Sequence, residues 1–186
     1  VPLVAPSGEA LDRLRADITA VRRDADLLVV ALHKGIVHTP AVLAPYERPL
    51  AEAALDAGAD VVVGHHAHIL RGVELRRGRP LFHGLGNGCV VTRALSPAQD
   101  HPARAAWARK RREMFGFEPD PRYELAPFHP EAVHAVLGVV RIEADGRMRM
   151  GVIPVHVGPP GRPVCVDDVR ADQVFAYLDR IGAMAG

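Results

Sequence analysis

The chain is poor in aromatic residues, in cysteine and in lysine. Aromatic side chains make up 5% of the 186 residues, and the formal net charge at pH 7 is only +1. Nucleic-acid binding needs an excess of basic charge, and single-strand binders add aromatic platforms on which bases stack. The composition therefore predicts no nucleic-acid partner, and the small net charge argues against a dedicated contact with a membrane surface.

Long apolar runs are also missing. None approaches the roughly 20 residues that cross a bilayer, and the opening Val-Pro-Leu-Val-Ala-Pro lacks the apolar region of a signal peptide. As written, the sequence predicts a cytoplasmic chain without a membrane segment, whereas an amino-terminal anchor on a longer form would place the protein at the cell envelope. A first residue of valine favours a start inside a longer protein or an alternative start.

The sequence contains two cysteines, Cys89 and Cys165, which lie far apart in the chain. This spacing fits two free thiols at least as well as one disulfide, so it leaves the redox state open. Cys89 follows a glycine-rich loop, where we expect a small buried apolar residue.

The residues that are present describe a globular protein of ordinary size. Hydrophobic residues make up 48% and charged residues 24%, which predicts one domain over residues 1–186. Within it, six prolines interrupt residues 96–130 and predict a lid or an ordered surface loop. The basic stretch 103–112 inside this segment predicts a solvated helix face, with an anionic polymer as the alternative partner.

The first half of the chain predicts a strand–helix–strand unit. Apolar residues at helical spacing predict helices over 8–24, capped by Ser7, and over 46–57. The run 27–32 is continuously apolar, which is typical of a strand covered on both faces, and 60–63 predicts a second strand. Two strands joined through a helix are parallel, so their carboxyl ends meet at one rim of the sheet, where α/β proteins bind ligands.

The second half of the chain predicts two hairpins and a closing helix. The hairpins are 73–76 with 80–83, and 135–143 with 148–157, the latter around Asp145-Gly146. Residues 158–161 predict a linker, and a helix capped by Asp168 is expected to follow and run to 181.

The most unusual stretch is 64–68, Gly-His-His-Ala-His, directly after the strand 60–63. His33 ends the preceding strand, so the parallel arrangement predicts that it shares a rim with His66 and His68. Imidazole is the commonest protein ligand of transition metals, and three imidazoles can hold one Zn²⁺. A solvated histidine-rich turn is the alternative interpretation of 64–68.

The remaining histidines are expected to be structural or solvated. His83 is expected in a cross-strand surface pair, and His156 as a structural residue on a strand. Solvated positions are expected for His101, His129 and His134.

Three blocks of sequence resemble the CapA family of capsule and poly-γ-glutamate synthesis proteins. They are residues 25–35 (Ala-Asp-Leu-Leu-Val-Val-Ala-Leu-His-Lys-Gly), 56–68 (ending in Gly-His-His-Ala-His) and 78–87 (Gly-Arg-Pro-Leu-Phe-His-Gly-Leu-Gly-Asn). The resemblance implies a mixed α/β fold, α+β in some schemes, with part of a calcineurin-like metallophosphoesterase β-sandwich and flanking helices. It covers the carboxyl-terminal part of the family, and the Asp-bearing amino-terminal blocks of the family have no counterpart here.

The same resemblance implies roles for individual residues. His33, His66 and His68 resemble metal ligands, and the implied cofactor is a divalent metal, Zn, Mn or Fe. The site is dinuclear in the family, and mononuclear or empty in a chain without carboxylate ligands. His65 and Asn87 are implied at the catalytic pocket, His65 facing the substrate or standing behind the ligands.

Lys34 and the pair Val37-His38 depart from the family pattern. Lys34 stands where the family has Trp, and a lysine there would favour a substrate carboxylate, as in polyglutamate or a peptide. The resemblance thus implies a metal-dependent hydrolase or transferase of capsule or poly-γ-glutamate biosynthesis acting on an anionic polymer or peptide. The alternatives are a non-catalytic remnant or binding protein, and a phosphoesterase or peptide-modifying enzyme on the same scaffold.

A chain that holds only part of this fold would leave apolar strand faces uncovered. If the first sheet is incomplete, the strands that begin near Leu27 and Val61 would expose apolar faces, because nothing would cover them. We therefore expect aggregation or a homodimer through the uncovered sheet.

Overall fold

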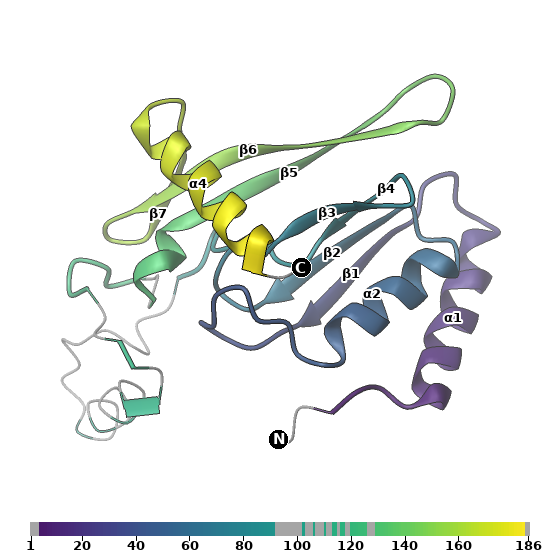
Figure 1. Ribbon diagram of the computed structural model, residues 1–186, viewed down its shortest axis with the longest axis horizontal. Coiled ribbons are helices and arrows are strands. Elements are labelled where there is room, and N and C mark those ends of the chain that lie inside the picture. Colours follow the sequence, from purple (N-terminus) through teal and green to yellow (C-terminus); the bar gives the residue numbers. More distant parts are fainter. Residues whose placement is uncertain are drawn as a thin grey trace.

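The structure is a computed structural model that describes residues 4–91, 129–184 and, between them, positions 102, 106, 110, 113–114, 116–117 and 120–125. Figure 1 shows two sheets with helices packed around them. In chain order the elements are α1 (Gly8–Arg22), β1 (Val29–Lys34), α2 (Glu47–Asp56), β2 (Val61–His66), β3 (Val73–Arg76), β4 (Arg79–Phe82), the 3-10 helix η1 (Pro130–Val133), β5 (His134–Ile142), β6 (Met148–Gly158), β7 (Arg162–Cys165) and α4 (Val169–Met184). The expected mixed α/β fold is confirmed.

The first sheet has the strand order β1-β2-β4-β3. β1 and β2 pair in parallel across α2, which confirms the predicted strand–helix–strand unit. β3 and β4 form the predicted antiparallel hairpin, and β4 pairs in parallel with β2. The carboxyl ends of β1 and β2 therefore share one rim.

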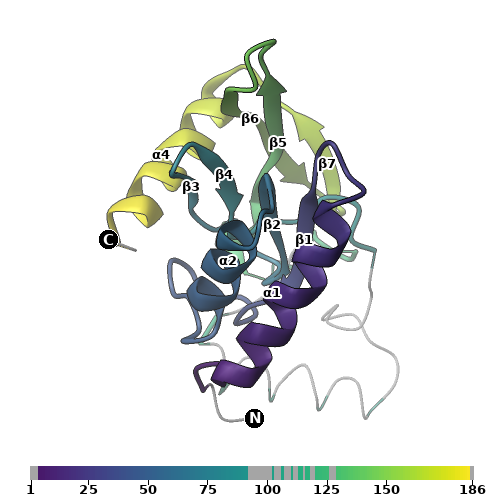
Figure 2. The same cartoon turned by 90° about the vertical axis from the view of Figure 1, so that its right-hand side faces the viewer.

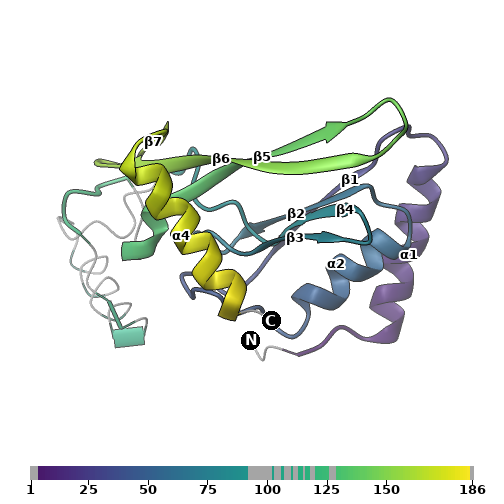
Figure 3. The ribbon, with the colours of Figure 1, turned by 45° about the horizontal axis from the view of Figure 1, so that its top comes forward.

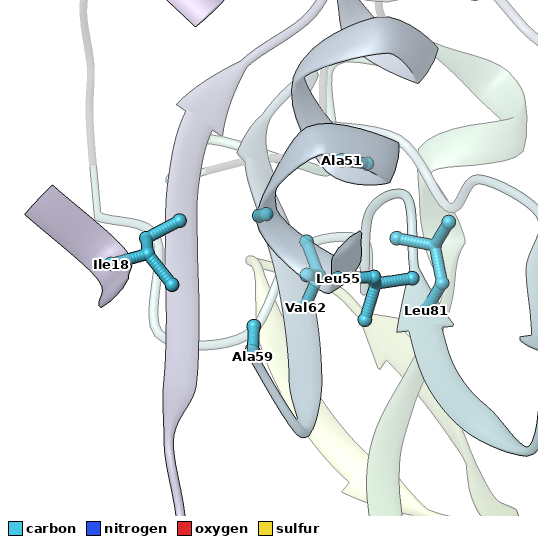
Figure 4. Packing of buried hydrophobic residues seen from close by; sticks show 7 residues of the cluster. Ile18, Ala51, Leu55, Ala59, Val62 and Leu81 are labelled. Carbon is cyan, nitrogen blue, oxygen red and sulfur yellow. The ribbon is translucent and has the colours of Figure 1, made fainter. Parts of the chain in front are cut away.

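Helices α1 and α2 lie side by side on one face of this sheet (Figures 1 and 2). Figure 4 shows Ile18 of α1 and Leu55 of α2 pointing into a cluster with Val62 and Leu81 from the strands. Burying a side chain of this size contributes about 1.5–3 kcal/mol, so this cluster anchors the helices to the sheet.

Polar contacts fix the ends of α1. Ser7 caps the helix as predicted, accepting from the backbone N–H of Ala10 at 3.2 Å. At the other end Arg22 contacts the Asp60 carboxylate at 2.5 Å, and that carboxylate also accepts from the N–H of Leu28 at 2.8 Å. Asp60 thus ties α1 to the amino-terminal end of the sheet, away from the histidine-bearing rim.

The second sheet has the order β5-β6-β7 and lies as a layer over the first (Figure 3). Phe82 of β4 packs close to Gly138 of β5, where an added Cβ would lie 3.0 Å from the Phe82 ring. α4 packs on this sheet through Val174, Tyr177 and Ile181. As predicted, Asp168 caps α4, since its carboxylate accepts from the N–H of Arg170 at 2.9 Å.

The expected coverage of β1 is wrong. β1 is an edge strand of its sheet. Val29 is 51% exposed, and Leu27, just before the strand, is 44% exposed. The continuous apolar run indicates burial, but the second sheet does not extend over β1. Exposure near Leu27 was expected from an incomplete sheet, whereas Val61 on β2 is only 4% exposed because it lies inside the sheet.

The expected linker at 158–161 is also different in the structure. These residues form a tight turn, with Gly161 N–H bonded to the carbonyl of Gly158 at 2.8 Å, and the turn returns the chain into β7. β7 was missed because its sequence, Arg-Pro-Val-Cys, is short and begins beside proline.

Two expectations remain predictions. The expected lid or loop at 96–130, with the basic helix 103–112 and His101, falls mostly outside the described residues, and the single domain 1–186 is a prediction that the structure does not test. Within the part of the chain that is described, no helix combines the length and the apolar character that a membrane crossing needs.

Candidate functional site

The rim of the first sheet brings the predicted histidines together. In the register of β1 and β2, His33 lies opposite His65 and Lys34 opposite His66. His33 Nε2 lies 2.9 Å from His66 Nδ1, and the two ring centroids are 4.7 Å apart. The ring of His68 lies 6.4 Å from that of His66. The inference that parallel strands place His33 beside the 64–68 stretch is confirmed.

The backbone turns sharply where these side chains gather. β2 ends at His66, and His66 and His68 have φ values of +95° and +53°. Non-glycine residues rarely adopt this left-handed region, and such strain is typical of functional sites. His66 and His68 therefore converge through a turn and not through the alternation of a strand. Gly64 is required just before, since any Cβ there would collide with the carbonyl of His83.

Asn87 fixes the orientation of His68. The Asn87 side chain is 1% exposed; its Oδ1 lies 3.1 Å from His68 Nδ1, and its Nδ2 donates to the His68 carbonyl at 3.2 Å. Because an amide oxygen only accepts, His68 Nδ1 carries the proton and Nε2 keeps a free lone pair. Outer hydrogen bonds of this kind orient metal-binding histidines.

The glycine-rich loop before Asn87 passes close to the second sheet. An added Cβ on Gly86, whose φ is +82°, would lie 2.8 Å from both the His134 carbonyl and the Ala135 Cβ. This explains the glycine: only a residue without a side chain lets the loop reach β5 and hold Asn87 beneath His68.

A cavity of about 570 Å³ opens in front of the histidines. One wall carries His33, His65, His66 and His68, and the facing wall is apolar, with Val136, Leu137 and Val155 from the second sheet. Among the described residues that line it, no side chain is a carboxylate, a lysine or an arginine. Its chemistry is therefore that of imidazoles against an apolar wall.

Both cysteines line this cavity. Cys89 lies in the loop after Asn87 and Cys165 on β7, and both are exposed. The expectation that Cys89 is a buried apolar residue is wrong, because the loop continues along the cavity mouth. The sequence contains no signal for Cys165, since β7 reaches the cavity only through the packing of the second sheet.

The environment keeps the central imidazole neutral. Burial lowers the pKa of His66 below its ordinary value, and the neighbouring His33 and His68 lower it further. A neutral imidazole is the form that binds a metal. His66 is thus available as a ligand at neutral pH.

The donor set suits one ion better than two. His33 Nε2 and His66 Nδ1 share a hydrogen bond of 2.9 Å. Two nitrogens bound to the same tetrahedral Zn²⁺ at 2.0–2.1 Å would lie about 3.3 Å apart, so one ion could replace the shared hydrogen after a small separation of the rings. As they stand, no three His, Cys, Asp or Glu side chains in the described chain are arranged as a ligand cluster. Two dications would repel without a bridging carboxylate, and the described residues that line this cavity include none.

Lys34 does not face this cavity. Its ammonium lies 2.9 Å from Glu47 Oε2, and the two side chains are 4% and 1% exposed. The expected pairing of Lys34 with a substrate carboxylate is therefore wrong, because the last residue of β1 points toward α2, on the face opposite His33.

Three other histidines differ from expectation. His83 is 4% exposed and contacts Glu74 of β3 at 2.5 Å, so the expected surface pair is a buried one. His129 is not simply solvated, since its Nδ1 accepts from the N–H of Glu131 at 3.1 Å and caps η1. His134 is half-buried opposite His156 on the second sheet, and its ring stacks on Tyr177 at 5.0 Å.

Comparison with known proteins shows what the part of the chain that carries this site is similar to. Residues 3–90 match the family described as bacterial capsule synthesis protein PGA_cap. The PGA biosynthesis protein CapA of Bacillus subtilis is 40% identical over 70 residues, 38% of this chain and 18% of the relative. The capsule biosynthesis protein CapA of Bacillus anthracis is 41% identical over 64 residues, 34% and 15% of the two chains.

A third relative comes from Mycobacterium tuberculosis. This probable polyglutamine synthesis accessory protein is 34% identical over 79 residues, 42% of this chain and 20% of its own length. The matched segments thus span a fifth or less of each of these relatives, and the family match contains His33, the 64–68 stretch and Asn87. Residues 3–90 of this chain are therefore similar to the capsule synthesis family, and the chain resembles its CapA members over this segment.

Proposed function

We propose that this chain carries the histidine part of a metal-dependent hydrolase or transferase site that acts in capsule or poly-γ-glutamate biosynthesis. The observation that supports it is the convergence of His33, His66 and His68, from β1, the end of β2 and the following turn, at one cavity. The names of the Bacillus relatives support capsule or PGA synthesis as the process.

In this proposal the three imidazoles hold one divalent ion. His33 Nε2, His66 Nδ1 and His68 Nε2 are the donor atoms, and Asn87 keeps the proton of His68 on Nδ1. A metal bound here would supply an activated water and would polarise the substrate oxygen. His65 is exposed at the cavity and faces the substrate.

The proposed substrate class rests on capsule or PGA synthesis, the process in the names of the Bacillus relatives, and not on the residues that line the cavity. We propose an anionic polymer or peptide whose reacting group enters at the histidines, with phosphoester chemistry as the alternative on the same scaffold. Because no basic residue among the described ones lines the cavity, the negative charge of such a polymer would have to meet the metal or remain outside.

A non-catalytic binding protein is the second candidate. It is favoured by the lack of a carboxylate among the described lining residues, since a dinuclear site of the family type needs one. The two candidates differ in whether a bound metal turns over substrate.

Metal content decides whether the imidazoles form a metal site. Purified chain incubated with Zn²⁺, Mn²⁺ or Fe²⁺ and desalted should retain about one ion per chain by elemental analysis. His66→Ala should lose it, whereas His65→Ala, the adjacent histidine, should retain it. Less than about 0.1 ion per chain, unchanged in His66→Ala, would remove the metal-dependent function.

Turnover then separates the enzyme from the binding protein. The metal-loaded chain is assayed on a γ-glutamyl peptide and on an aryl phosphate, with His66→Ala as the control. Turnover of either substrate that disappears in His66→Ala supports the enzyme. If the metal-loaded chain turns over neither substrate, the result supports the binding protein.

A further inference from the structure

A second cavity, of about 180 Å³, lies on the other side of the short ladder that bounds the histidine cavity. The ladder consists of the bonds from Arg71 N–H to the Gly84 carbonyl, at 2.9 Å, and from His83 N–H to the Gly72 carbonyl, at 3.1 Å. Gly84 lines the first cavity, while Arg71, Gly72 and His83 line the second. The end of α4 closes it at Gly182, beside β3 (Figures 1 and 2). The second cavity is thus separate from the proposed metal site.

Arg71 is a buried cation without a carboxylate partner in the described chain. It is 1% exposed, and its two terminal nitrogens donate to the carbonyls of Val42 and Ile36. The nearby carboxylates are already paired: Glu47 with Lys34 at 2.9 Å, and Glu74 with Arg48 at 3.0 Å. Buried charges in proteins are normally paired, so Arg71 leaves one positive charge uncompensated beside the cavity.

Two buried side-chain atoms at this cavity also lack a hydrogen-bond partner among the residues described. They are Arg71 Nε and His83 Nδ1, on side chains that are 1% and 4% exposed. Each unsatisfied buried polar atom costs free energy, so the two atoms call for a partner that fills the cavity.

Arg71 Nε and His83 Nδ1 need opposite kinds of hydrogen-bond partner. Arg71 Nε always carries a hydrogen and donates. Burial raises the pKa of Glu74, but His83 and Arg48 together outweigh burial and lower that pKa, so the carboxylate is ionised and can only accept from His83 Nε2, which lies 2.5 Å away. His83 Nε2 therefore carries its hydrogen, and Nδ1 offers a lone pair. Burial lowers the pKa of His83, which favours this neutral form.

We propose that this second cavity binds a small oxyanion that carries its own proton, such as hydrogen phosphate. A charged oxygen accepts from Arg71 Nε and compensates the guanidinium charge, while the hydroxyl donates to His83 Nδ1. Sulfate has the same size and geometry but no proton at neutral pH, and it would leave His83 Nδ1 unsatisfied. The site is independent of the metal proposal.

Gly72 provides a variant that blocks the cavity without removing a contact. It lines the cavity, an added Cβ meets nothing within 4 Å, and its φ lies outside the left-handed region. Gly72→Leu should therefore fill the cavity in a folded protein. Gly88→Leu is the matched control, since Gly88 is equally open but lines the histidine cavity. Substituting Arg71 itself would release two carbonyls and risk misfolding.

The test is a calorimetric titration of the chelator-treated chain with inorganic phosphate and, separately, with sulfate and hydrogencarbonate. We expect saturable binding of phosphate with Kd below about 1 mM and binding of sulfate at least about tenfold weaker. Gly72→Leu should abolish phosphate binding and Gly88→Leu should leave it unchanged, with circular dichroism confirming that both are folded. Binding of hydrogencarbonate in place of phosphate would also support the proposed class.

Three outcomes would overturn the proposal. One is the absence of saturable binding of either proton-bearing anion, which would mean that water fills the cavity. Another is equal affinity for phosphate and sulfate, which would remove the role of His83. The third is phosphate binding that survives Gly72→Leu but is lost in Gly88→Leu, which would place the anion at the histidines.

Discussion

Lys34 Nζ lies 2.9 Å from Glu47 Oε2 in a pair of side chains that are 4% and 1% exposed. The second Glu47 oxygen accepts from the N–H of Ala44 at 2.8 Å, so the pair joins the end of β1, the loop 35–46 and the start of α2. Burial lowers the pKa of Lys34 and outweighs the opposing effect of Glu47. The pair therefore holds the segment that follows His33, and neither residue lines the histidine cavity.

Removing one partner of this pair should destabilise the fold strongly. Glu47→Gln leaves the buried ammonium of Lys34 without a counter-charge, and breaking such a pair costs about 3–5 kcal/mol. Chemical denaturation should show this loss in the free energy of unfolding. Asp56→Asn is the control, because its pair with Arg77 is exposed and its loss should cost less than about 1 kcal/mol. Similar losses in both variants would contradict the assignment.

Asn87 should control metal affinity without being a ligand. Asn87→Ala frees His68 to rotate and to change tautomer, so zinc affinity should fall about 10- to 100-fold. Competition with a chromogenic chelator measures this. Gly88→Ala, next in the chain and open to solvent, should retain the affinity of the parent. An unchanged affinity in Asn87→Ala would show that the Asn87–His68 contact does not orient the ligand.

His83 should make the fold less stable in acid. Its pKa is lowered in the folded state, mainly by burial, so the unfolded chain takes up a proton at higher pH than the folded one. Stability is complete above the unfolded pKa and is lost as pH falls through the window between the unfolded and folded values. The slope is at most about 1.4 kcal/mol per pH unit for this one group.

The measurement compares urea unfolding from pH 7.5 to 5 in the parent and in His83→Gln. The variant should be less stable throughout but should show a shallower decline, because one titrating group is missing. Parallel curves would mean that His83 titrates alike in both states, against the burial seen here.

The second sheet should promote self-association. Leu137, Val139 and Ile153 share one of its faces by register and alternation, and are 51%, 41% and 42% exposed. We propose a concentration-dependent homodimer, because an exposed apolar face favours burial against another copy. Sedimentation velocity should show a dimer that Val139→Thr with Ile153→Thr weakens.

Leu75→Gln is the control for this prediction. Leu75 is 52% exposed but lies on β3, at the far edge of the first sheet. Its substitution should leave the dimer intact. A monomer at all concentrations in the parent chain, or equal loss in both variants, would contradict association through the second sheet.

The local elements and the meeting of the histidines could be predicted from the sequence. Some features depend only on neighbours in the chain, so a sequence pattern predicts them. They are the caps Ser7 and Asp168, the turn at Asp145-Gly146 and the apolar periodicity of α1 and α2. The parallel strand–helix–strand unit then required that His33 lie beside the 64–68 stretch, because two parallel strands end at the same rim.

The surroundings of these elements depend on tertiary packing and could not be predicted from the sequence. The positions of the Lys34 and His83 side chains depend on their carboxylate partners. Lys34 contacts Glu47 of α2, and His83 contacts Glu74 of β3. The same holds for the exposure of Val29, for which an apolar strand sequence predicts burial but cannot say where the covering sheet stops. Burial, charge pairing and cavity walls arise between distant segments, and a single sequence does not record those distances.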